Sequence, residues 1–181
     1  ELFSIERVGK SGSKFDPEKA KWFNHHYLSA LDNASVAALL GNLLKEKGLV
    51  ASQDYIQEVV ALTKERAVLI PDLYEQSWFF FSSPDTYDEK VIQKFWKPET
   101  PALLGKLADL LKHTVDFSAE SLETSIKAFI HDNGLGMGQV MNTLRLVLVG
   151  GSFGPGVAAI IATLGREETL KRISRAGEVI H

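Results

Sequence analysis

A short glycine-rich motif near the C-terminus carries the most explicit candidate chemistry in this sequence. The segment Gly154–Ala159 reads Gly-Pro-Gly-Val-Ala-Ala and follows an apolar run, Leu144–Val149. Its spacing matches the fingerprint that holds a dinucleotide pyrophosphate at a helix N-terminus, which would make a nucleotide-dependent enzyme the rival hypothesis. Pro155, however, lacks one of the N–H groups that this chemistry needs. A charged helix also follows where a strand and a ribose-binding acid belong, so we expect a turn rather than a dinucleotide site.

Two other groups of polar residues lack the spacing that their chemistry requires. Residues 9–11, Gly-Lys-Ser, resemble the end of a phosphate-binding loop, but Ser4 stands where the upstream glycine is needed. His25 and His26 are adjacent, and on a helix their side chains would point about 100° apart, so they cannot share one metal ion. The scattered carboxylates are typical of solvated helix surfaces. We expect no catalytic, cofactor-binding or metal-binding residue here.

Four consecutive aromatic residues, Trp78–Phe81, form the densest aromatic run of the chain. Such rings could stack on unpaired bases, as they do in proteins that bind single-stranded nucleic acids. Consecutive side chains of a helix point in all directions, however, which favours packing on several sides. We expect the run to lie in the core, at a junction between helical units.

The composition is that of a globular protein without a strong charge bias. Of the 181 residues, 45% are hydrophobic and 24% are charged, and the net charge of −3 gives no global support to nucleic-acid binding. The acidic excess lies in residues 28–136, which leaves both ends slightly basic. Cysteine is absent, which fits a reducing compartment. No apolar run suits a membrane span or a signal peptide, so we expect a cytoplasmic protein without a membrane partner.

Helical periodicity and capping residues predict the elements that carry these groups. Asp16-Pro17 and Ser52 are typical of helix starts, and Gly48 is typical of a helix end. The turn-rich segment Ser82–Asp85 favours a boundary between two helical units. Apolar residues recur three and four positions apart, which predicts an all-α fold. We expect helices at about 16–31, 35–47, 52–62, 73–81, 88–96, 99–115, 118–132, 139–149, 157–164 and 166–180.

Two long stretches of the sequence resemble bacterial glutamyl-tRNA synthetases. The first, residues 2–28, carries Phe-Asp, Lys, Trp-x-Asn and Tyr-Leu at the family's spacings. The second, residues 135–173, carries a Leu-Arg pair, a short apolar run, a Gly-Pro-Gly loop, Leu-Gly-Arg-Glu and Arg-Ile in the family's order. The likeness spans nearly all of the chain and is loosest between residues 82 and 130.

The resemblance implies two helical anticodon-binding subdomains of a longer enzyme. Residues 1–30 would end the stem-contact region, residues 31–86 would form the first subdomain and residues 87–181 the second. The family's catalytic signatures, His-x-Gly-His and Lys-Met-Ser-Lys-Ser, have no counterpart here, so this part of a glutamate–tRNA ligase would be inactive alone. The implied partners are glutamate tRNA, bound through its anticodon loop, and the N-terminal catalytic domain. That domain would use ATP and magnesium, whereas no cofactor is expected in this chain.

The resemblance also assigns anticodon contacts to particular residues. A base-reading arginine after the third helix maps onto Lys64, with Arg66 two residues away, and the arginine of the Leu-Arg pair maps onto Arg145. Arginine suits this role because its planar fork of donors matches base and phosphate acceptors. A structural role for Arg145, as a helix cap or ion-pair partner, is the alternative, and a helical protein–protein interaction domain is the rival function. The loop residues that would meet bases are Gly154, Pro155, Gly156 and Val157.

Overall fold

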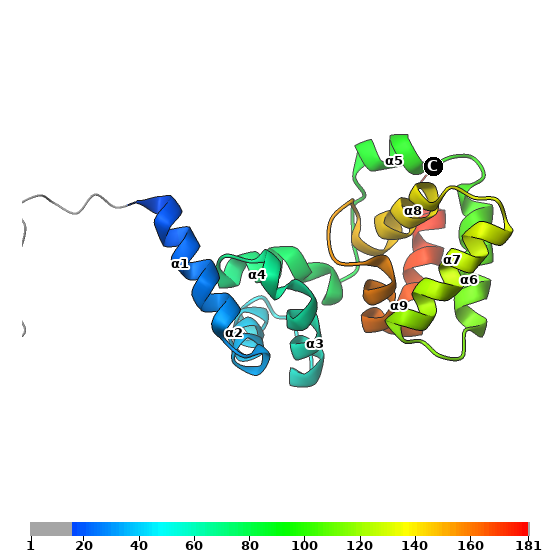
Figure 1. Ribbon diagram of the computed structural model, residues 1–181. Coiled ribbons are helices and arrows are strands. Elements are labelled where there is room, and N and C mark those ends of the chain that lie inside the picture. The colour runs from blue at the N-terminus through cyan, green and yellow to red at the C-terminus, as the bar shows by residue number, and fades with distance from the viewer. Residues whose placement is uncertain (1–15, 181) are drawn as a thin grey trace, which may run out of the picture.

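The architecture consists of helices joined by turns and short loops (Figure 1). The computed structural model describes residues 16–180, and this part of the chain contains no strand, which confirms the expected all-α fold. None of the helices within it combines the length and the apolar character needed to cross a membrane. The elements are α1 (Pro17–Ala30), α2 (Asn33–Glu46), α3 (Gln53–Thr63), η2 (Lys64–Arg66), α4 (Ile70–Ser77), η3 (Trp78–Phe80), α5 (Glu89–Phe95), α6 (Thr100–His113), α7 (Ala119–Asp132), α8 (Met137–Val149) and α9 (Val157–Val179).

Side-chain caps determine where several helices begin. Asp16 Oδ1 accepts a hydrogen bond from the N–H of Glu18 at 3.1 Å, and Pro17 occupies the first position of α1. Ser52 caps α3 in the same way by accepting from the N–H of Tyr55. Each cap satisfies a donor that has no acceptor within its own helix. Both helix starts agree with the sequence-based expectation.

Two helix starts lie upstream of the expected positions. The α2 helix begins at Asn33 because Asp32, rather than Ser35, is the cap and accepts from the N–H of Ser35 at 2.8 Å. The α4 helix begins at Ile70, with Pro71 in its first turn, where a missing N–H costs no helical hydrogen bond.

The first hydrophobic core lies between α2, α3 and α4. Val36, Leu40, Val60 and Leu73 are fully buried in it. Of the residues of α1, only Leu28 is buried, and the rest of that helix extends away from the body of the molecule (Figure 1). The first unit is therefore built on three packed helices with α1 attached at one end.

The second and larger core forms around α9, against which α6, α7 and α8 all pack (Figure 1). Residues 146–149 of α8 are fully buried, which explains why this apolar run has no polar face. Because the run is helical, the strand that a dinucleotide site would need before Gly154 is not formed. Gly165, with φ of 76° and ψ of 168°, divides α9 at the position expected between the two closing helices.

The aromatic run packs between the two units, as expected. Phe79 and Phe80 are 0% and 5% exposed and belong to the larger core, and Phe81 packs against both cores. The hydroxyl of Tyr55 in α3 donates to the carbonyl oxygen of Phe80 at 2.9 Å. The α3 helix also contacts α9 directly, so the two units are held side by side.

Candidate nucleic-acid interface

The loop between α8 and α9 consists of residues 150–156. Its first residue is held by contacts with residues 86–88, in the segment that links the two units. Gly150 ends α8 with φ of 82°, and its carbonyl accepts a hydrogen bond from the N–H of Asp88 at 2.8 Å. A Cβ on Gly150 would lie 2.7 Å from the carbonyl oxygen of Thr86. Glycine alone fits both this left-handed backbone conformation and the close approach. The packing therefore fixes where the loop begins.

Gly154 then folds the loop against the aromatic junction. Its φ is 96°, and a Cβ there would lie 3.1 Å from Cζ of Phe79. Pro155 and Val157 are buried, whereas Gly156 is exposed and opens α9 without a side-chain cap. The first-turn N–H groups of α9 have no acceptor within their own helix, and they form the positive end of its dipole. The loop thus presents backbone donors beside Gly156.

Arg145 binds this loop from α8. Its Nη1 donates to the carbonyl oxygens of Phe153, Gly154 and Pro155 at 2.9, 3.1 and 2.6 Å. The side chain is half-buried. Its burial, and secondly the positive charge of Arg66, lower the pKa of the Arg145 guanidinium from its ordinary value, but an arginine of this kind remains a cation at neutral pH. Arg145 therefore organises the loop and brings a positive charge to it.

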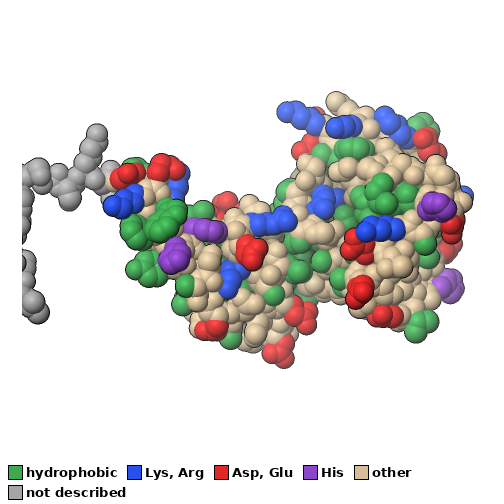
Figure 2. Space-filling model, in the orientation of Figure 1, with side chains coloured by type: hydrophobic (Ala, Val, Ile, Leu, Met, Phe, Trp, Pro, Cys, Tyr) green, Lys and Arg blue, Asp and Glu red, His purple; other side chains and the backbone are tan. Residues whose placement is uncertain are grey.

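A second guanidinium reaches the same loop from the first unit. Nη1 of Arg66 donates to the carbonyl oxygen of Gly154 at 2.7 Å, so that oxygen accepts from two arginines. Within residues 16–180, neither arginine forms an ion pair with a carboxylate. Figure 2 shows Lys and Arg side chains along the hollow where the two units meet. Two neighbouring cations without a counter-charge attract an anion or a base edge rich in acceptors.

Lys64 is not brought to this loop. Its Nζ donates to the carbonyl oxygen of Leu31 at 2.8 Å, at the C-terminal end of α1. The family resemblance assigned anticodon contacts to several residues. The structure brings together Arg66, Arg145 and the segment Gly154–Val157, whereas Lys64 lies elsewhere.

Phe153 is a further residue of this site that the sequence reasoning did not single out. Its side chain is 40% exposed, and its ring makes an edge contact with Phe79 at a centroid distance of 5.8 Å. The only sequence signal was an aromatic residue within a glycine-rich loop, Gly150–Gly156. An exposed ring in this loop is a suitable surface for an unpaired base.

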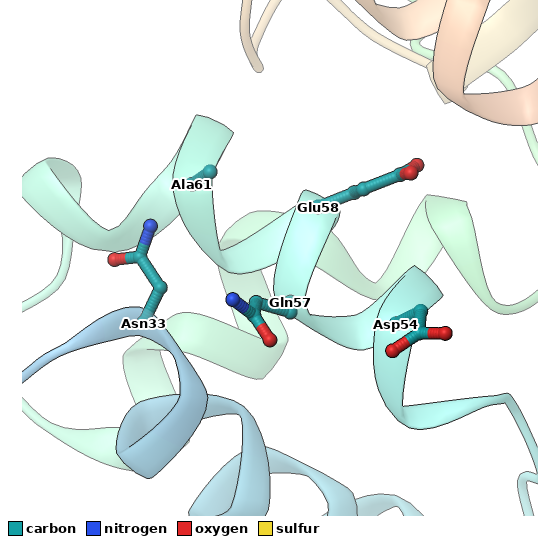
Figure 3. Close-up of a pocket in the computed structure, with 5 residues that line it drawn as sticks. All are labelled: Asn33, Asp54, Gln57, Glu58 and Ala61. Carbon is teal, nitrogen blue, oxygen red and sulfur yellow. The ribbon is translucent and has the colours of Figure 1, made fainter.

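A hollow between α2 and α3 is a weaker candidate for a binding site. Figure 3 shows the carboxylate of Glu58 pointing away from the amides of Asn33 and Gln57. Its side chains therefore do not converge on one bound group. The hollow measures about 340 Å³ and is lined by Asn33, Asp54, Gln57, Glu58 and Ala61.

Metal binding also finds no support in the described part of the chain. Among residues 16–180, no group of three or more His, Cys, Asp or Glu side chains is placed to hold a metal ion. Nδ1 of His25 lies 2.9 Å from the carbonyl oxygen of Ala67, whereas His26 stacks on Trp22. The two histidines thus have different partners, as their spacing predicts. The Gly-Lys-Ser segment, residues 9–11, lies outside the described residues.

Comparison with known proteins finds a family model, relatives and solved structures that match this chain. The model of the anticodon binding domain matches residues 35–177. The chain is 48% identical over 179 residues to a glutamate–tRNA ligase of Porphyromonas gingivalis and 46% identical to that of Phocaeicola vulgatus. In each case the match covers 99% of this chain and 35% of the relative, so the chain spans about a third of the length of these proteins. The crystal structure of a glutamate tRNA ligase from Elizabethkingia meningosepticum, 38% identical, superposes with a TM-score of 0.90 over 99% of this chain and 36% of that one.

Proposed function

Because this chain belongs to the anticodon binding domain family, we propose that it binds the anticodon loop of glutamate tRNA. In a longer glutamate–tRNA ligase it would hold that tRNA while a separate catalytic domain, using ATP, joins glutamate to the acceptor end. Such a role in translation belongs to the cytoplasm. The family match favours this function over a helical domain that binds only other proteins.

The observation that carries the proposal is the convergence of Arg66 and Arg145 on the carbonyl oxygen of Gly154. Anticodon bases are unpaired in the free tRNA, so they can be turned outward and read along their edges. A guanidinium offers several coplanar donors, and it suits both base acceptors and phosphate oxygens. Among residues 16–180, each arginine bonds through Nη1 alone, to this loop, so its other nitrogens can serve a ligand.

The negative net charge of the chain does not oppose this function, because charge acts locally. The total of −3 includes acidic residues of α3, such as Asp54 and Glu58, that line a different hollow. At the 150–156 loop, the cations of two units meet without a carboxylate partner among the described residues. Phosphates within about 10 Å of these charges would be attracted at moderate ionic strength.

Titration of the 181-residue chain with glutamate tRNA, at several salt concentrations, tests the proposal. We expect the affinity to fall as salt rises, because phosphate contacts release counterions. We also expect weaker binding of the same tRNA with a changed anticodon. Equal affinity for both tRNAs at every salt concentration would contradict anticodon recognition.

A further inference from the structure

We propose that the short helix η2 couples the 150–156 loop to α1, and that Lys64 is the positioning residue of this coupling. The coupling rests on the proposed function and goes beyond it, because it concerns how a bound anticodon arm affects the direction of α1. In a longer ligase with a preceding catalytic domain, α1 would be the described helix nearest to that domain in the sequence.

The α1 helix is attached to the rest of the molecule by few apolar contacts. Leu28 is its only buried residue, and the helix extends away from the first unit (Figure 1). Its connection to α2 consists of Leu31 and Asp32, which are both in extended conformations. Little buried apolar surface therefore fixes the direction of α1, so its polar contacts matter more.

Two hydrogen bonds hold α1, and both involve η2 or the residue that follows it. Nζ of Lys64 donates to the carbonyl oxygen of Leu31 at 2.8 Å, and Nδ1 of His25 lies 2.9 Å from the carbonyl oxygen of Ala67. The last turn of α1 contains no basic residue of its own. Lys64 thus supplies the cation that the negative end of the α1 dipole attracts. The direction of α1 is tied in this way to the position of η2.

The η2 helix is itself held firmly in the first unit. The residues on either side of it, Thr63 and Ala67, are both fully buried. The hydroxyl of Thr63 donates to the carbonyl oxygen of Val59 at 2.8 Å, and the N–H of Ala67 donates to that of Lys64 at 3.2 Å. Because these close-packed contacts leave η2 little freedom, its side chains move together.

The other contact of η2 is with the 150–156 loop. Nη1 of Arg66 donates to the carbonyl oxygen of Gly154 at 2.7 Å. Lys64 and Arg66 point in different directions, so η2 contacts α1 through one side chain and the loop through the other. An anticodon arm bound at the loop orders Arg66, and through η2 it orders α1. The coupling is reciprocal, because an α1 held by Lys64 then favours binding of the arm.

Distances between spin labels measure the direction of α1. The chain contains no cysteine, so introduced pairs of cysteines can be labelled without background. Asn24→Cys in α1 with Ala128→Cys in α7 reports on α1, whereas Ala38→Cys in α2 with Ala128→Cys reports on the two units without α1. All three positions are exposed. We expect an anticodon-arm hairpin of glutamate tRNA to narrow the distance distribution of the α1 pair.

Substitution of Lys64 tests whether this residue carries the coupling. Lys64→Met keeps an apolar chain of similar length but removes the donor. We expect the α1 pair to broaden in the free chain, the narrowing by the hairpin to be lost and the α2 pair to stay unchanged. Lys64→Arg keeps a cationic donor and should behave like the original chain. Lys45→Met, at an exposed position of α2, is the matched control.

The possible outcomes separate the coupling from the proposed function. Absence of hairpin binding overturns the proposed function, and the coupling falls with it. Hairpin binding that leaves the distribution of the α1 pair unchanged overturns the coupling alone. So does a Lys64→Met chain in which the α1 pair keeps both its original width and its narrowing. Thermal melting of each variant checks that the fold is kept.

Discussion

Arg145 combines two roles that the sequence left as alternatives. Its Nη1 holds three consecutive carbonyls of the loop, which is a structural role. Its guanidinium also lies close enough to Arg66 for the charge of Arg66 to lower its pKa. Two cations without an anion repel each other, so an RNA phosphate or base acceptor would relieve this repulsion. The same side chain can thus order the loop and contact the ligand.

Arg145→Ala should separate these roles. If Arg145 reads a base, cognate tRNA binding should weaken by roughly 1–3 kcal/mol and the preference over an anticodon mutant should shrink. If it contacts only phosphate, both tRNAs should weaken about equally and the salt dependence should become shallower. Affinity for cognate and mutant tRNA at three salt concentrations, with the melting temperature of the variant, measures all of these effects. An unchanged cognate-to-mutant ratio would exclude base reading by Arg145.

The neighbouring positions Lys64 and Arg66 show how local geometry assigns a role to one residue and not the other. Both lie in η2, a 3-10 helix with about three residues per turn, so side chains two positions apart point in different directions. Lys64 faces the end of α1 and Arg66 faces the Gly154 loop. Arg66 is therefore the better candidate for a base-reading arginine in this part of the chain.

At the scale of the loop, two nearby glycines should respond differently to a methyl group. Gly154→Ala would strain a backbone at φ of 96° and push a Cβ to 3.1 Å from Phe79, so we expect a loss of about 1–3 kcal/mol in unfolding free energy. Gly156→Ala is the matched control, because its φ is −57° and a Cβ there would meet nothing within 4 Å. Urea unfolding of the two variants provides the comparison. Equal destabilisation would show that the positive φ of Gly154 is not needed.

A polar network ties α9 to the linker between the units. Nε of Arg172, which is 2% exposed, donates to Glu168 Oε1 at 2.8 Å, and Nη1 of Arg172 donates to the carbonyl of Leu148 at 2.6 Å. The hydroxyl of Ser83 donates to the same Glu168 oxygen at 2.6 Å. Burial alone would raise the pKa of Glu168, but the hydrogen bonds from Ser83 and Arg172 outweigh this effect, so the pKa is lowered.

This lowered pKa predicts a pH dependence of stability. A carboxylate with a depressed folded-state pKa stabilises the fold above its ordinary pKa of 4.5, and that contribution is lost as the pH falls through the lower folded-state value. Glu168→Gln should therefore destabilise the protein at pH 7, and the difference from the unmodified chain should shrink toward pH 3. Urea unfolding across this range is the measurement, with Glu75→Gln, at an exposed position of α4, as the control. A constant difference at all pH values would mean that the Glu168 charge does not stabilise the fold.

At the scale of the whole molecule, the candidate site exists only because two hydrophobic cores are joined. Arg66 belongs to the first unit, Arg145 and the 150–156 loop belong to the second, and Phe79 lies between them. A change that separates the units would therefore break the contact between Arg66 and the loop without altering any residue of the site. The same arrangement explains why the loop can be both well packed and accessible at one surface (Figure 2).

The whole chain should bind tRNA without activating an amino acid. It matches the anticodon binding domain family and spans 35% of a related glutamate–tRNA ligase. We therefore expect no glutamate-dependent exchange of pyrophosphate into ATP by the 181-residue chain, with or without tRNA. An isotope exchange assay with an intact relative as the positive control checks this. Exchange that requires glutamate and tRNA would refute the assignment of this chain to binding alone.

The sequence by itself determined that the fold is helical, roughly where the helices lie, and the caps of α1 and α3. Asp16 and Ser52 act within one turn, and the apolar periodicity of a helix is a local property, so both could be read from neighbouring residues. The motifs shared with relatives also identified Arg145 and the Gly-Pro-Gly loop as candidate contacts. Even the burial of the aromatic run followed from its spacing, because four consecutive rings of a helix cannot all face solvent.

Tertiary structure alone decided which arginine of the first unit meets the loop, and that Phe153 within the loop is exposed. The bond from Arg66 to Gly154 joins residues 88 positions apart, and its formation depends on the angle at which the two cores pack. No local pattern encodes that angle, since it results from many side-chain contacts around Phe79 and between α3 and α9. The same packing places Lys64 against the end of α1, although the family resemblance had assigned the base-reading position to it.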